Sequence, residues 1–153
     1  MLLFKQERGE LLGLGSVPEN AVDNCRPATE GDTVETSREM DLFWVDGRYQ
    51  GIQIKMLVDS GSSRTMISEN RYLDLWKEAR PILKTYSGPS ISTVNGERFS
   101  PFGSINLNLE IGTSSKLQNV LVVRNLPLDF IIGGDYLWEN KCILDYSLGK
   151  FCC

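Results

Sequence analysis

Short stretches of alternating apolar and polar residues constrain the fold of this chain more than any other feature. The clearest covers residues 105–111, where every second position is apolar from Ile105 to Ile111 before Gly112 ends the pattern. This two-residue period is typical of a β-strand with one buried face. Residues 120–123 are continuously apolar, and we predict that they form the partner strand.

Similar stretches recur along the chain, separated by turn-forming residues. The pairs Asp46-Gly47 and Asn95-Gly96 each stand between two extended segments, which is typical of β-hairpins. The further predicted strands are residues 42–45, 51–58, 65–67, 84–86, 90–94, 98–102, a segment within 128–135 that runs into a glycine turn, and 142–146, which we expect to be the last strand.

Two segments predict short helices. Ser68 is a candidate N-cap for residues 69–79, and Pro81 follows their end. The apolar face of this helix would be formed by Tyr72, Leu73, Trp76 and Ala79. A second short helix is expected at residues 136–140. Because the strands do not alternate with long helices, the sequence predicts an all-β or mainly β, barrel-like domain.

The first 40 residues differ in character from the rest. From residue 9 they are rich in Glu, Asn, Gly, Pro, Ser and Thr, without a strand or helix period. We therefore expect residues 1–40 to be a disordered or linker tail and residues 41–153 to be the folded domain.

Charge and composition exclude several classes of function. The net charge of −4 offers no basic surface for nucleic acid, and no stretch approaches the roughly 20 apolar residues that cross a bilayer. We expect an intracellular protein without nucleic-acid or membrane partners. The four cysteines are Cys25, Cys142, Cys152 and Cys153, which we expect to be free thiols in a reducing compartment.

The absence of histidine narrows the chemistry further. Ser/His and Cys/His nucleophile pairs and the usual imidazole zinc sites are impossible in a chain with no histidine. Acid and base catalysis would therefore depend on carboxylates, and we expect no metal and no cofactor.

One carboxylate stands in an unusual place. The apolar residues 56–58 predict a strand end buried on both faces, and Asp59 follows them directly, within the small polar run Ser60-Gly61-Ser62-Ser63. A buried carboxylate costs desolvation unless its neighbours donate hydrogen bonds or it shares a proton. Such an arrangement favours a functional explanation over a plain turn.

Three segments together resemble the retropepsin-like aspartic proteases, in particular those of long-terminal-repeat retrotransposons. They are residues 56–63, the hairpin at 94–96, and residues 130–137 with their Ile-Ile-Gly-Gly-Asp sequence. The resemblance covers about residues 41–151. It implies a closed, mostly β subunit in which residues 131–133 pack beside the Asp59 loop and a hairpin around Gly96 forms a flap over a polypeptide substrate.

The resemblance also implies a homodimeric aspartic endopeptidase that processes a retroelement polyprotein. The Asp-Ser-Gly triplet occurs once in the chain, so a pair of catalytic carboxylates needs two copies of Asp59. Ser60 would join a hydrogen-bond network across the dimer, and Gly61 would allow close approach to the substrate. A Ser62 hydroxyl that donates to Asp59 would favour the ionised carboxylate and give a more acidic pH optimum than in Ser62→Ala.

The substrate would be held by further residues on three segments. Beside Ser62, Ser63 extends the catalytic loop toward the substrate. The flap candidates are Thr93, Val94, Asn95, Gly96 and Glu97. Leu128 and Ile131 are candidate apolar subsite walls, which would favour hydrophobic side chains around the cleaved bond.

Several residues have simpler interpretations. Asp135 is better explained as a helix N-cap than as a second catalytic acid, and Asp145 as structural. Arg64 lies either beside a subsite or in solvent. The alternative functions are a catalytically silent dimerisation or peptide-binding module, and a domesticated cellular relative. A cellular relative of the ubiquitin-shuttle type is disfavoured, because the tail carries no ubiquitin-like pattern.

Overall fold

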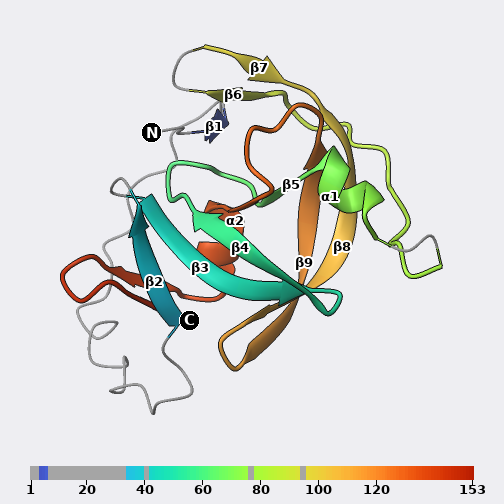
Figure 1. Cartoon of the computed structure of the whole chain (residues 1–153). Helices are drawn as coiled ribbons and strands as arrows, with labels where there is room; N and C mark the ends of the chain where they lie inside the picture. The colour runs from blue at the N-terminus through green and yellow to red at the C-terminus, as the bar shows by residue number, and fades with distance from the viewer. Residues whose placement is uncertain (1–3, 7–33, 40–41, 76–77, 94–95) are drawn as a thin grey trace.

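The computed structural model describes residues 4–6, 34–39, 42–75, 78–93 and 96–153, which form a mainly β architecture with two short helices (Figure 1). The predicted fold class is confirmed. The strands are β1 (Phe4–Gln6), β2 (Val34–Glu39), β3 (Leu42–Tyr49), β4 (Ile52–Val58), β5 (Met66–Ser68), β6 (Ile91–Thr93), β7 (Arg98–Phe99), β8 (Pro101–Ile111), β9 (Ser114–Val123), β10 (Phe130–Ile132), β11 (Ile143–Asp145) and β12 (Lys150–Cys152). The helices are α1 (Glu69–Leu73) and α2 (Gly134–Glu139).

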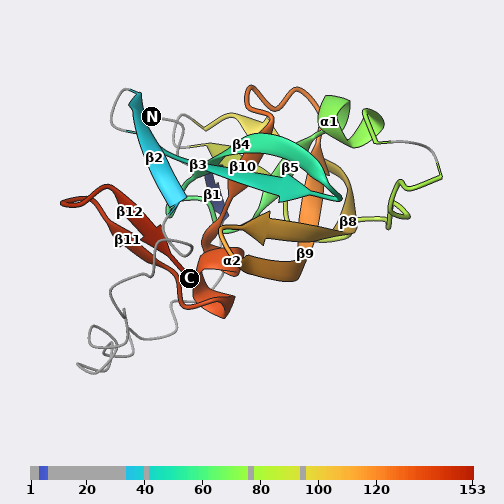
Figure 2. The same ribbon diagram turned by 60° about the horizontal axis from the view of Figure 1, so that its bottom comes forward.

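Most strands join one sheet whose pairing closes on itself. Among the described residues this sheet runs β11-β12-β2-β3-β4-β10-β5-β9-β8, and β8 pairs in addition with β3. The strands β3, β4, β10, β5, β9 and β8 therefore form a closed ring. Strands β11 and β12 lie outside this ring, on the side of β2 (Figures 1 and 2).

Strand β3 allows the ring to close because its two halves pair with different strands. Residues 42–45 pair with β2, whereas residues 47–49 pair with β8. A Cβ added at Gly47 would lie 2.8 Å from the carbonyl oxygen of Glu110 in β8. Glycine is thus required here for close approach of the two backbones.

The predicted turn at Asp46-Gly47 is therefore wrong, because both residues lie inside β3. The chain turns instead at Gln50 and Gly51, whose φ angles are 48° and 82°. Two consecutive residues with positive φ match the right-handed twist of the flanking strands in a two-residue hairpin. A glycine inside a strand and a glycine in a turn look alike in the sequence.

The segments predicted to pair, residues 105–111 and 120–123, lie in the paired strands β8 and β9, but their register differs from the prediction. Only Ile105 lies opposite Val120, whereas residues 106–111 pair with residues 114–119. Ile105, Leu107 and Leu109 are fully buried, and β8 pairs along its length with β9. A second buried cluster lies beneath the β6–β7 hairpin, and its members are Leu57, Met66, Ile91, Leu121, Val123, Leu126 and Ile131.

Helix α1 begins as predicted and ends early. The Ser68 side chain accepts a hydrogen bond from the Arg71 amide at 3.2 Å, which confirms the N-cap. The helix stops at Leu73, which is half exposed, and the Arg80 guanidinium donates to the carbonyls of Leu73 and Leu75. Those carbonyls are thereby satisfied without another helical turn.

The predicted apolar helix face is only partly correct. Tyr72 is buried, whereas Leu73 and Ala79 are exposed, and Trp76 lies outside the described residues. Within the described part of the chain, no helix is long and apolar enough to cross a membrane.

Two predicted strands also differ. Residues 84–86 form only a single bridge, Lys84 to Ser104. The strand predicted at 142–146 is β11, and it is followed by β12, which places Phe151 in the core. Part of the expected tail enters the sheets: β1 pairs with β6, and β2 pairs with β3 and β12.

The cysteines are not all free thiols as expected. Cys142 and Cys153 form a disulfide, and Cys152 is not part of it. Antiparallel pairing of Ile143 with Cys152 brings the flanking Cys142 and Cys153 to a Cα distance of 4.0 Å. The sequence could not reveal this pair, because it depends on the register of β11 and β12.

We predict that Gly47→Ala lowers the free energy of unfolding by about 1–3 kcal/mol, because the added methyl group overpacks the contact with Glu110. Urea unfolding at fixed protein concentration measures the change. Gly51→Asn is the control, since nothing lies within 4 Å of its Cβ position and asparagine tolerates positive φ. Equal losses in both variants would contradict the assignment.

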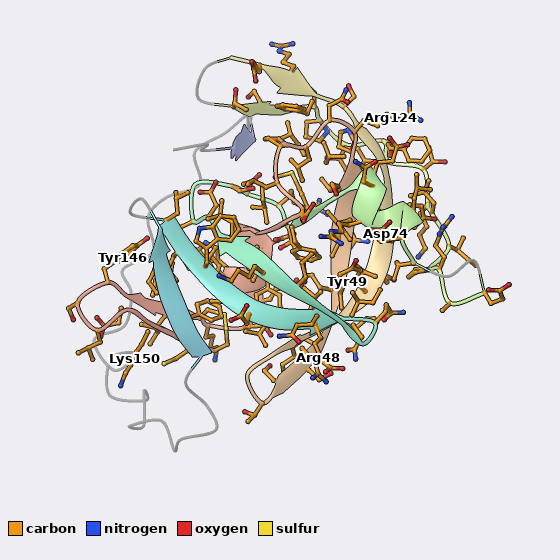
Figure 3. The ribbon with its side chains drawn as sticks, viewed as in Figure 1. Arg48, Tyr49, Asp74, Arg124, Tyr146 and Lys150 are labelled. Atoms are coloured by element: carbon orange, nitrogen blue, oxygen red, sulfur yellow. A yellow bond between two sulfur atoms is a disulfide. The ribbon has the colours of Figure 1, made fainter. Side chains whose placement is uncertain are left out.

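The turn between β11 and β12 is held by Asp145, as its structural interpretation requires. Its carboxylate accepts bonds from the Ser147 hydroxyl, the Ser147 amide and the Leu148 amide. Next to it, Tyr146 packs edge-to-face on Phe43 at 5.3 Å between ring centroids (Figure 3).

The hydrogen bond from the Ser147 side chain, followed by that from the Leu148 amide, holds the pKa of Asp145 below its ordinary value. A lowered carboxyl pKa means that the turn's stabilisation is present above the ordinary pKa and is lost as pH falls through the lowered one. Ser147→Ala should raise the pKa toward the ordinary value, as a carboxyl NMR titration would measure. An unshifted titration midpoint would show that the hydroxyl does not stabilise the anion.

Candidate active site

The Asp59 loop leaves the barrel where β4 runs parallel to β10. The pairing joins Leu57 with Ile131 and Val58 with Ile132, and the Asp59 amide then donates to the Ile132 carbonyl at 3.0 Å. Asp59 is 7% exposed. The sequence prediction that the Ile-Ile-Gly strand packs beside this loop agrees with these contacts.

The loop turns tightly around the Asp59 carboxylate. The Gly61 amide donates to Asp59 Oδ1 at 2.9 Å, and the Ser62 amide donates to the Asp59 carbonyl at 3.1 Å. A backbone donor stabilises the ionised carboxylate and offsets part of its desolvation. Ser60 is exposed, and Gly61 and Ser63 are partly exposed.

The hypothesis that Ser62 donates to Asp59 is wrong for this arrangement. The Ser62 hydroxyl is buried and donates to the Arg64 carbonyl at 2.8 Å. A hydroxyl carries one proton, so it cannot donate to Asp59 at the same time. Ser62 stabilises the loop, and the predicted shift in pH optimum has no basis in this geometry.

The far end of the loop is held by Asp135. Its Oδ1 accepts from the Thr65 amide at 2.8 Å, the Thr65 hydroxyl at 2.6 Å and the Tyr136 amide at 2.8 Å. Its Oδ2 accepts from Arg64 Nε at 3.1 Å. The prediction that Asp135 is the N-cap of α2 is wrong. The N-cap is Gly133, whose backbone is extended.

Arg64 is accordingly neither a purely solvated side chain nor a demonstrated subsite residue. Besides Asp135, it donates to Asn119 Oδ1 in β9 at 2.9 Å.

Burial raises the pKa of Tyr136, the residue after Asp135, so its phenol stays neutral near neutral pH.

The two glycines before Asp135 allow the loop to lie directly against the start of α2. The Gly134 amide donates to the Ser62 carbonyl at 2.6 Å, and the Asp135 amide donates to the Ser63 carbonyl at 3.1 Å. A Cβ at Gly133 would overlap the backbone carbonyl of Arg64. Any larger residue at 133 would push the Asp59 loop away.

The predicted flap is a hairpin formed by β6 and β7. The Thr93 amide donates to the Glu97 carbonyl at 2.8 Å, the Gly96 amide donates to the Thr93 carbonyl, and Gly96 has a φ of 83°. Val94 and Asn95 lie outside the described residues. Ile91 of the hairpin belongs to the same buried cluster as Leu57 of β4 and Ile131 of β10.

The two predicted subsite residues differ in exposure. Ile131 is fully buried in the cluster that also contains Ile91, so it presents no surface to a substrate in this arrangement. Leu128 is partly buried at the edge of the same cluster. Its role as a subsite wall stays a prediction.

Sequence reasoning missed the importance of Thr65. This threonine is fully buried, and its hydroxyl also accepts from the Gly133 amide at 3.1 Å. The available signal was a polar residue at the start of an otherwise apolar predicted strand. Among the described residues, no group of three or more potential ligands is arranged to hold a metal ion.

Three solved structures share this architecture. The retroviral protease-like domain of Ddi1 from Leishmania major has a TM-score of 0.54 and 15% sequence identity, and the match covers 71% of this chain and 85% of that one. The EIAV protease complexed with the inhibitor HBY-793 has a TM-score of 0.51 and 16% identity, and the match covers 68% of this chain and 92% of that one. A retropepsin-like aspartic protease from Rickettsia conorii has a TM-score of 0.55 and 18% identity, and the match covers 79% of this chain and 87% of that one. The fold is that of the retropepsin-like aspartic proteases. No protein-family model and no curated protein matches the sequence.

Within the retropepsin-like fold, the three segments that suggested the family occupy connected positions. The Asp59 loop and the Gly133-Gly134 turn are hydrogen-bonded to each other, and the β6–β7 hairpin packs on the strands that precede them. The fold thus unites what lies far apart in the sequence.

Thr65→Val should lower the free energy of unfolding by about 2–4 kcal/mol, because it leaves the buried Gly133 amide without an acceptor and removes a donor to Asp135. Thr65→Ser is the matched control, since it keeps the hydroxyl. Chemical denaturation at fixed protein concentration tests the difference. Similar losses in the two variants would mean that the methyl group, rather than the hydroxyl, matters.

Proposed function

We propose that this protein is an aspartic endopeptidase that acts as a homodimer, with Asp59 of each copy as the catalytic pair. The observation that carries the proposal is a buried carboxylate on a tightly bonded loop in a retropepsin-like fold. The three similar structures are a retroviral protease-like domain and two proteases.

Dimerisation follows from counting the acids. The chain contains one Asp-Ser-Gly triplet, and Asp135, the other acid beside the loop, is engaged by Thr65 and Arg64. A second catalytic carboxylate must therefore come from a second copy. Ser60, exposed next to Asp59, is available for contact across the dimer axis.

The chemistry needs only the two carboxylates and a water molecule. Two carboxyl groups a few ångströms apart cannot both ionise cheaply, so they share one proton. The ionised group takes a proton from the water as its oxygen attacks the peptide carbonyl carbon, and the protonated group donates to the developing oxyanion. Proton transfer to the amide nitrogen then breaks the carbon–nitrogen bond and releases an acid and an amine.

The substrate would be an extended polypeptide held under the β6–β7 hairpin, which excludes water when closed. Apolar side chains around the cleaved bond would suit the apolar cluster beneath the hairpin. Processing of a retroelement polyprotein in an intracellular compartment is the role that we infer for this activity.

A catalytically silent peptide-binding or dimerisation module is the second candidate. It is favoured by one observation, the complete burial of Ile131, which leaves this expected subsite closed. Cleavage assays separate the two candidates.

Asp59→Asn should abolish cleavage of a hydrophobic peptide, with a loss of roughly 10³-fold or more, because the dyad loses its shared proton and its base. A pepstatin-type inhibitor should block the unmodified protein. Asp46→Asn, which changes an exposed carboxyl group in β3, is the control. Cleavage that survives in Asp59→Asn would refute the proposal.

The same assay, repeated on dilution, tests the dimer. Because only the dimer contains both carboxylates, the rate should fall faster than linearly with protein concentration, alongside a fall in mass in solution. A strictly linear rate from a monomeric species would contradict the shared site.

A further inference from the structure

The ion pair between Arg64 and Asp135 lies at the end of the catalytic loop, and the proposed chemistry does not use it. Its Nε to Oδ2 distance is 3.1 Å, and the side chains are only 26% and 19% exposed. Other ion pairs among the described residues, such as Arg71 with Asp129, are more exposed and lie away from this loop.

We propose that Arg64 is a positioning residue: through Asp135 and Asn119 it fixes the loop that carries Asp59. This inference rests on the proposed peptidase function. The Arg64 guanidinium donates to Asp135 and Asn119, so it acts by holding the loop in place and not on the reacting atoms.

The two oxygen atoms of the Asp135 carboxylate have different partners. Oδ1 accepts three hydrogen bonds, two of them from Thr65, whereas Oδ2 accepts from Arg64. The guanidinium therefore sets the rotation of the carboxylate and offsets its charge. That rotation aims Oδ1 at Thr65 and holds the loop end.

Both ends of the loop are hydrogen-bonded to one short segment, residues 132–135. Asp59 is bonded to Ile132, and Thr65 is bonded to Gly133 and Asp135. A shift of Asp135 thus moves one end of the loop relative to the other, and the Asp59 carboxylate turns with it.

Arg64 also connects this segment to strand β9 of the barrel, because it donates to both Asp135 and Asn119. Its Nη2 donates to Asn119 Oδ1 in β9, and Asn119 in turn donates to Asn106 in β8 at 3.0 Å. The planar guanidinium can hold two partners in fixed directions, which a lysine ammonium does less well. The loop, α2 and β9 are thereby locked into one geometry.

Catalysis is sensitive to such a lock. Catalytic groups must be held to within about 0.5 Å, and a 1 Å misplacement can cost roughly 100-fold in rate. Loss of the ion pair should therefore reduce turnover more than substrate binding.

The test compares three variants with one control. Arg64→Met removes the ion pair and keeps the aliphatic stem. Asp135→Asn keeps Oδ1 for Thr65 and turns an amide donor toward Arg64 in place of Oδ2. The third variant combines both changes. Arg124→Met is the control, because Arg124 also places its Nε on a carboxylate, Glu69 at 3.2 Å, at an exposed position beside α1 (Figure 3).

Arg64→Met and Asp135→Asn should each lower kcat roughly tenfold or more with KM changed less than about twofold, measured per mole of folded dimer. The double variant should be no worse than the poorer single variant, because both changes break the same contact. Arg124→Met should retain the original kcat. A rise in KM alone, additive losses, or an unchanged kcat would overturn the proposal.

Hydrogen exchange keeps this test independent of activity. The amides of Gly134 and Asp135, which donate into the loop, should exchange faster in Arg64→Met than in Arg124→Met. Unchanged exchange would overturn the positioning role even in a protein that cleaves nothing. Faster exchange without cleavage by the unmodified protein would instead reject the proposed peptidase and retain the structural lock.

Discussion

The hydrogen bonds between the Asp59 loop and the residues that follow β10 are the contact on which the rest of this molecule depends. A carboxylate that is 7% exposed needs donors nearby, and the chain supplies them from its own backbone through Gly61. The loop can adopt this shape only because Gly133 leaves room for the carbonyl of Arg64. The same short loop therefore buries the Asp59 carboxylate, supplies a donor to it and packs closely against Gly133.

The barrel holds the two sides of this contact in register. Strands β4 and β10 run parallel, so their ends, and the loops after them, emerge at the same edge of the sheet. The ring closes through β3, which pairs with β2 along one half and with β8 along the other. In a closed ring β4 has little freedom to slide against β10. The loops that follow these two strands are therefore held in a fixed relative position.

In the proposed dimer, one catalytic acid per chain is sufficient, because the second copy supplies the other. Asp135, the second acid near the loop, is fully engaged in holding Thr65 and Arg64, so its role is mechanical. Asp59 stands beside exposed Ser60, where a second copy can meet it. Similar structures with 15–18% identity show how much of such a sequence can vary while the fold persists.

Local sequence patterns correctly predicted those strands and helices that are determined by residues close together in the chain. Alternation identified residues 105–111, and Ser68 identified the start of α1, because strand burial and N-capping depend on nearest neighbours. The same reasoning misplaced the turn at Asp46-Gly47, since a glycine needed for contact with a distant strand has the same appearance as a turn glycine.

By itself, the sequence determined the strand-rich composition, the absence of histidine and the position of one acid after a buried strand. Only the tertiary structure decided that Ser62 donates to Arg64, that Asp135 holds Thr65, and that Cys142 meets Cys153. The physical reason is the same in each case. Each of these side chains could contact several different partners. Pairing between strands that are far apart in the sequence decides which partner lies next to it.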